Sequence, residues 1–191
     1  MDIQQLLGIL SGVIASTAFI PYVISIARKK TKPHPISWVL WTIIGGFILV
    51  SYWGVGARET IWLALINFLG PLTITILSIK YWDRGFSRFD YTCLSMSAAS
   101  IVLWIVFRSA SLALTFNILA DMLAATPTLR KVWNDPSTES PSAWGIFIIG
   151  NLLSVAAIKT WSYGVALLPV YLTCLSISIA LIALFRRKLI K

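Results

Sequence analysis

Polar side chains that could bind a ligand or carry a proton are few in this chain, and they stand inside long apolar runs. Asp121 is the one acidic residue deep within such a run, and Asn117 precedes it by four residues. On a helix this spacing places both side chains on one face. A charge at mid-membrane costs about 2.5–3.5 kcal/mol on insertion scales, so Asp121 should face a bundle interior or water. We expect it to contact a substrate or bind a proton; a structural hydrogen bond between helices is the alternative.

Asn151 is a further polar residue deep within an apolar run. A side-chain amide both donates and accepts hydrogen bonds, which suits a neutral hydroxylated or zwitterionic ligand. The structural alternative is a hydrogen bond between helices, which is worth about 0.6 kcal/mol in a membrane. Both readings need Asn151 to point into a helical bundle.

The apolar runs that hold these residues dominate the composition. Of 191 residues, 58% are hydrophobic and 12% are charged, against about 25% charged in a soluble domain. Runs of about 20 apolar residues without period-2 alternation predict transmembrane helices, not barrel strands. We expect seven spans, of which the second, fourth and sixth are short. The expected ranges are Leu6–Ala27, Ile36–Trp53, Thr60–Tyr81, Tyr91–Phe107, Ser111–Leu129, Ala143–Ile158 and Val165–Phe185.

Basic residues cluster between the spans in an asymmetric way. With the N-terminus outside, 13 of the 16 Lys and Arg fall on the inner side, and only Arg58, Arg108 and Lys159 fall outside. The positive-inside rule therefore predicts an outer N-terminus, a cytoplasmic C-terminus and an odd number of spans. Membrane topology thus accounts for the net charge of +9, and no nucleic-acid partner is expected. The small size suits a bacterial inner membrane.

Two loop-flanking stretches repeat at a spacing of 106 residues. Pro21–Trp38 reads PYVISIARKKTKPHPISW and Pro127–Trp144 reads PTLRKVWNDPSTESPSAW, with two prolines and the tryptophan aligned without gaps. A fixed period predicts two copies of one unit. We expect an all-α membrane protein with seven transmembrane helices as 3+1+3: residues 1–82 as a first three-helix repeat, 83–109 as a linker helix and 110–191 as a second repeat. The linker crossing keeps the two repeats parallel.

The repeated residues allow functional and structural roles. Pro21 and Pro127 each free a carbonyl four residues back, so each is either a hinge or a static kink. Trp38 and Trp144 either belong to an aromatic belt at the lipid interface or face a central path. The repeat also pairs Asn117 with Ser11 and Asp121 with Ala15, so the two copies differ at the expected site.

The duplicated three-helix unit, the basic loop after a proline and the single linker helix resemble the PQ-loop superfamily, which includes the MtN3/SWEET sugar transporters. The chain departs from the motif, because Tyr22 and Thr128 replace its glutamine. The resemblance implies that an asparagine on the third helix of each repeat contacts the substrate. Asn67 matches that position, and its repeat partner is Thr173.

Together these patterns predict a transporter of a small polar solute, sugar or amino-acid-like, that works by alternating access. Proton coupling through Asp121 and the oligomeric state stay open. A non-transporting receptor or assembly factor of the same fold is the alternative. No enzyme, metal or cofactor is expected, because the spans hold no His, acidic pair or Ser/His/Asp set. The residues expected at the site are Asp121, Asn67, Asn117, Asn151, Thr173, Trp38 and Trp144.

Overall fold

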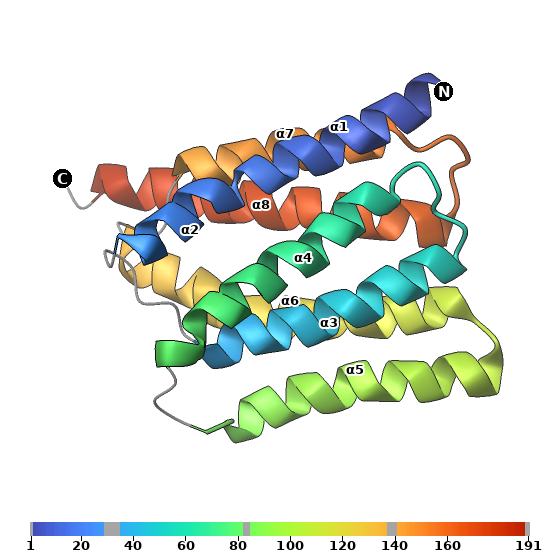
Figure 1. Cartoon of the computed structure of the whole chain (residues 1–191), viewed down its shortest axis with the longest axis horizontal. Coiled ribbons are helices and arrows are strands. Elements are labelled where there is room, and N and C mark those ends of the chain that lie inside the picture. Colours follow the sequence, from blue (N-terminus) through green and yellow to red (C-terminus); the bar gives the residue numbers. More distant parts are fainter. Residues whose placement is uncertain (1, 29–34, 82–84, 137–140, 190–191) are drawn as a thin grey trace.

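The computed structural model describes residues 2–28, 35–81, 85–136 and 141–189, and these residues are almost entirely helical, with no β-strand among them. The helices run back and forth between two opposite ends of one bundle (Figure 1). They are α1 (Ile3–Thr17), α2 (Phe19–Ala27), α3 (Pro35–Gly54), α4 (Ile61–Ser78), the 3-10 turn η1 (Ile79–Tyr81), α5 (Arg88–Phe107), α6 (Ala110–Asn134), α7 (Pro141–Ala156) and α8 (Tyr163–Leu189).

By length and composition, four helical stretches can cross a membrane: Ile3–Ile24, Ile61–Ser78, Arg88–Phe107 and Tyr163–Arg186. Three shorter apolar helices, Trp38–Gly54, Ala110–Thr126 and Ala143–Ala156, lie at the other expected spans. Large apolar side chains stay exposed on the bundle surface, among them Ile105 at 73% and Leu181 at 60%. Such a surface fits lipid and indicates a membrane-embedded protein.

The expectation that the fourth span is short is wrong. α5 begins at Arg88, three residues earlier than expected, and spans 20 residues. A capping box starts it: the Ser87 hydroxyl accepts from the Asp90 N–H at 3.2 Å, and Asp90 Oδ2 accepts from the Ser87 N–H at 2.7 Å. These bonds satisfy backbone donors of the first turn.

The first expected span is found as one helical stretch, Ile3–Ile24, with a one-residue irregularity. α1 ends at its C-cap, Ala18, whose N–H bonds the Ala15 carbonyl at 3.2 Å, and α2 follows directly. Pro21 lies in the first turn of α2, where a missing N–H is tolerated. In the second copy, by contrast, α6 continues through position 127. The side chain of Pro127 lies outside the described residues, as do the loop positions 29–34 and 137–140 of the repeated stretches.

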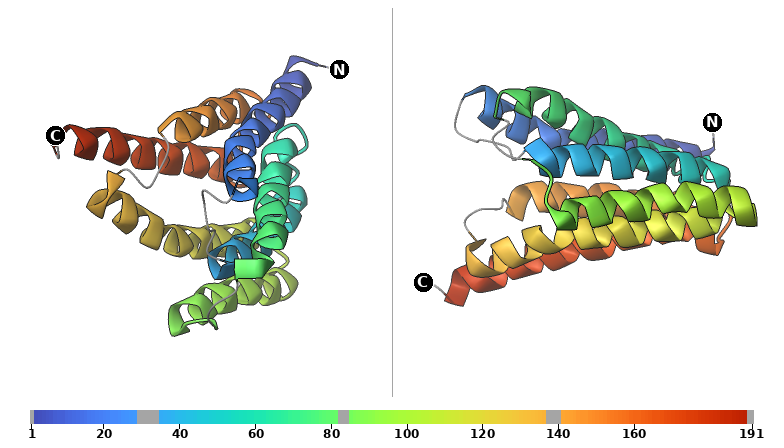
Figure 2. Two further views of the ribbon diagram at one scale, coloured as in Figure 1. Left: turned by 60° about the vertical axis from the view of Figure 1, so that its left-hand side comes forward. Right: turned by 90° about the horizontal axis from the view of Figure 1, so that it is seen from below.

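Six helical segments close a ring in which each packs against two neighbours, in the order α1, α4, α3, α6, α8, α7. α1, α4 and α3 form one layer, and α7, α8 and α6 form another (Figure 2). α5 lies outside the ring, against α6 and α3. In each layer the helix that comes last in sequence, α4 or α8, lies between the other two.

Candidate functional site

The inner face of α6 carries the two polar residues on which the expected site depends. Asn117 Nδ2 donates to the Ser51 hydroxyl of α3 at 3.2 Å. One turn later, Asp121 Oδ2 accepts from the Tyr171 hydroxyl of α8 at 2.7 Å. α6 lies between α3 and α8 in the ring. Since Asn117 bonds α3 and Asp121 bonds α8, both side chains lie on the face of α6 that is turned into the ring.

The Asp121 carboxylate has a protein donor, as an ionisable group inside a membrane requires. Its side chain is nevertheless only partly buried. A hydrogen bond to a carboxylate is roughly twice as strong as one between neutral groups, so Tyr171 fixes the orientation of the carboxylate. The remaining acceptor capacity of Asp121 is available to a second donor, such as a ligand hydroxyl or amine.

Asn117 is fully buried but only half satisfied. Its amide nitrogen bonds Ser51, whereas its Oδ1 has no hydrogen-bond partner in the described part of the chain. A buried acceptor without a partner costs about 1–3 kcal/mol. A ligand donor reaching this oxygen would remove that cost, so Asn117 is suited to recognise an O–H or N–H group.

Asn151 ties α7 to α8. Its Nδ2 donates to the Leu172 carbonyl at 2.9 Å and to the Ser176 hydroxyl at 3.0 Å. Its Oδ1 is also buried without a partner among the residues described. α8 therefore bonds both of its neighbours at adjacent residues. Tyr171 bonds Asp121 of α6, and the Leu172 carbonyl bonds Asn151 of α7.

Two predicted residues bond back onto their own helices. Asn67 Nδ2 donates to the Leu63 carbonyl at 2.9 Å, and the Thr173 hydroxyl donates to the Pro169 carbonyl at 2.7 Å. Thr173 is buried and Asn67 half-buried. No hydrogen bond links either residue to Asp121 within the described ranges, so their substrate role stays a prediction.

The Asn67 backbone, however, marks a close approach of two helices. Pro71 lacks the N–H that would bond the Asn67 carbonyl. Gly45 of α3 lies against this carbonyl, and a Cβ on Gly45 would lie 2.8 Å from the oxygen. The absence of a side chain at Gly45 therefore lets α3 pack on α4 at this point.

The two repeated tryptophans lie in aromatic and apolar clusters. The Trp38 ring centroid is 5.2 Å from that of Tyr22 and 5.1 Å from that of Trp41. Trp144 is 5.7 Å from Phe147 and packs against a small core that includes Val132 of α6. Both tryptophans are half-buried and lie in the first turns of α3 and α7.

The sequence reasoning did not foresee Tyr171 and Ser51 as partners of Asp121 and Asn117. Tyr171 offered a signal, because it is a phenol placed two residues before Thr173 in the middle of an apolar run. A tyrosine at such depth needs a hydrogen-bond partner. Ser51 offered none, since a serine can bond its own helix.

No known family model matches the chain, and no match appears among curated proteins or among solved structures.

Proposed function

We propose that the protein is a transmembrane transporter that moves a small polar solute, sugar or amino-acid-like, by alternating access. The observation that carries the proposal is the polar site on the inner face of α6: Asp121 held by Tyr171, and the unpaired Asn117 oxygen one turn away. A carboxylate and an amide oxygen together can accept several hydrogen bonds from a hydroxylated or amine-bearing solute.

The order of packing supports two like-oriented repeats joined by α5. If α1 and α2 count as one span, α4 and α8 are the third spans of their repeats, and each lies between the first and second spans. The contacts between repeats are also equivalent, since α1 packs on α7 and α6 packs on α3. An exchange of the two repeats leaves this pattern unchanged. In Figure 1, α6 runs in the same direction as α1, and α8 in the same direction as α4, as parallel repeats about an axis along the membrane normal require.

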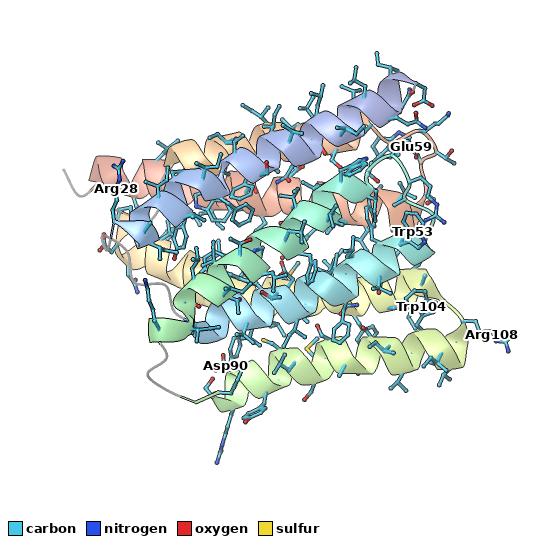
Figure 3. All side chains as sticks on the ribbon, in the orientation of Figure 1. Arg28, Trp53, Glu59, Asp90, Trp104 and Arg108 are labelled. Carbon is cyan, nitrogen blue, oxygen red and sulfur yellow. The ribbon has the colours of Figure 1, made fainter. Side chains whose placement is uncertain are left out.

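The charge distribution supports an outer N-terminus. Arg28 and Asp90 lie at one end of the bundle, and Arg108 and Glu59 lie at the other (Figure 3). The end with Arg28 carries the excess of basic residues in the sequence, so we assign it to the cytoplasm.

Uptake by the full chain in proteoliposomes tests the proposal. A panel of sugars and amino acids, each with and without a pH gradient, should contain a solute that enters above empty vesicles. Asp121→Asn keeps the shape and an acceptor for Tyr171 but removes the charge, and it should reduce this uptake at least tenfold. Asp90→Asn is the matched control at the α5 cap and should transport normally.

Two results would contradict the proposal. Uptake and pH dependence that are unchanged in Asp121→Asn would remove this carboxylate from the transport path. Saturable solute binding without uptake by any panel member would favour the receptor alternative.

A further inference from the structure

A groove at the end of the bundle that we assign to the outer side lies apart from the polar site. It has a volume of about 420 Å³ and is lined almost entirely by apolar atoms. The lining comes from the last turns of α3, the start of α4 and the end of α5: Leu49, Val50, Trp53, Gly54, Ile61 and Trp104. Figure 3 shows Trp53 and Trp104 at the same end of the molecule as Arg108.

Two arginines lie at the same end of the bundle as this groove, and one of them, Arg58, contacts its lining. The Arg58 guanidinium lies 3.6 Å from the centroid of the Trp53 ring, and its Nη1 donates to the Trp53 carbonyl at 3.2 Å. Arg108 is the C-cap of α5, one turn beyond Trp104. Both arginines are exposed, and neither has an ion-pair partner among the described residues. A guanidinium has five N–H donors, so Arg58 keeps most of its donors for another acceptor.

Few basic residues lie at the end of the bundle that holds the groove. Among the described residues, three basic side chains lie at this end of the bundle, and one of them, Arg58, contacts the groove through Trp53. The third, Lys159, is already paired with Asp2 at 2.6 Å. This end of the bundle thus combines an apolar groove with cations and tryptophans at the level where lipid headgroups lie.

We propose that this groove is a specific site for an anionic phospholipid of the outer leaflet. One acyl chain lies along Leu49, Val50 and Ile61, between the Trp53 and Trp104 rings. The phosphate lies between Arg58 and Arg108, since guanidinium groups bind phosphate through paired hydrogen bonds. A transmembrane helix from a protein partner could fill the apolar groove but would leave both arginines without a counter-charge.

Native mass spectrometry of the purified full chain, titrated with phosphatidylglycerol or phosphatidylcholine of equal chain length, tests the proposal. The first phosphatidylglycerol should bind at least fivefold more tightly than phosphatidylcholine. Arg58→Gln and Arg108→Asn should each lose about fivefold in affinity for phosphatidylglycerol. Asparagine is chosen at position 108 because the backbone φ there is +48°, a conformation that asparagine tolerates.

Lys159→Gln is the matched control, since it removes the third basic residue of the same end without touching the groove. Val50→Trp fills the groove and should weaken binding of both lipids at the first site. Equal affinity for the two lipids in the wild type would overturn the proposal. A loss in Lys159→Gln as large as that in the arginine variants would do so too, because it would show attraction to net charge alone.

Discussion

The contact of α1 with α7 and the contact of α6 with α3 occupy equivalent places in the ring, but different side chains build them. The 106-residue offset maps Ser11 and Ala15 of α1 onto Asn117 and Asp121 of α6, and Gly150 of α7 onto Ile44 of α3. At the first contact, a Cβ on Gly150 would lie 3.1 Å from the Ala15 nitrogen and the Ser11 carbonyl oxygen.

The difference assigns separate tasks to the two contacts. Small residues bring α1 and α7 together at backbone distance, as in membrane helix pairs held by close packing. The α6 contact instead presents a carboxylate and an unpaired amide oxygen to the ring interior. We infer that the α1–α7 contact stays closed while the α6 side binds solute, so the duplicated halves have unequal roles.

Gly150→Ile should have the largest effect. It places in the α1–α7 contact the residue that stands at the equivalent position, Ile44, in the α6–α3 contact. An isoleucine side chain cannot fit 3.1 Å from backbone atoms of α1, and overpacking costs about 1–3 kcal/mol. The melting temperature in detergent should fall by several degrees. Ile149→Leu changes the neighbouring, exposed residue of α7 and should melt like the wild type. An unchanged melting temperature in Gly150→Ile would show that the contact is not close-packed.

Asn117→Leu separates a ligand role from a structural role. The substitution removes the buried, unpaired oxygen together with one hydrogen bond, to Ser51 at 3.2 Å, so the melting temperature should change little, while uptake should fall about tenfold. Asn151→Leu is the comparison variant. It breaks the two hydrogen bonds between α7 and α8 and should lower the melting temperature. If Asn117→Leu destabilised the protein as much as Asn151→Leu, Asn117 would be a structural residue.

Tyr171→Phe should have a smaller effect on uptake. It removes one hydroxyl that donates to Asp121 at 2.7 Å and leaves the ring in place. The loss of about 1 kcal/mol of orienting interaction predicts an uptake rate about fivefold lower. Tyr163→Phe, which removes a hydroxyl bonded to Thr115 at the start of α8, is the control and should transport at the wild-type rate. Equal uptake rates for the two variants would show that the Tyr171 hydroxyl has no role in transport.

The ion pair between Asp2 and Lys159 should contribute least. The Lys159 ammonium bonds the exposed Asp2 carboxylate and holds its pKa below the ordinary 3.8, and Asp2 in turn raises the pKa of Lys159 above 10.5. The carboxylate contribution to stability is therefore present above pH 3.8 and lost as the pH falls through the lowered value. The lysine contribution is present below pH 10.5 and lost as the pH rises through the raised value.

Asp2→Asn should accordingly lower the melting temperature only slightly at neutral pH, because exposed pairs are screened. The difference from the wild type should vanish in strong acid and in 1 M salt. Melting curves at pH 7 and pH 2, with Lys159→Gln and the double variant completing a cycle, measure it. Asp2 also caps α1, because its Oδ1 accepts from the Gln5 N–H at 2.9 Å. A difference that persists at pH 2 would assign the effect to this cap instead.

Hydropathy and charge predicted the helical segments well, because lipid imposes the same requirement on every span. Ile61–Ser78 and Tyr163–Arg186 lie within a few residues of their expected ranges. The earlier start of α5 depends on the capping box of Ser87 and Asp90, which hydropathy does not measure. The Tyr171–Asp121 and Ser51–Asn117 bonds depend on how helices far apart in sequence rotate against one another. Hydropathy and residue spacing in one sequence do not specify these rotations, so the two hydrogen bonds could not be predicted.

In the proposed transport cycle, the ring interior at α6 opens to both sides of the membrane, whereas the α1–α7 contact stays closed. Single cysteines at the repeat-equivalent positions test it: Asn117→Cys and Ser11→Cys, in a background where Cys93 and Cys174 are replaced by alanine and serine. Both positions are fully buried in this structure. A membrane-impermeant thiol reagent, added to either face of reconstituted vesicles, should modify the cysteine at 117 from both faces and the cysteine at 11 from neither. Modification at 117 from one face only, or equal modification at the two positions, would rule out alternating access through the ring interior at α6.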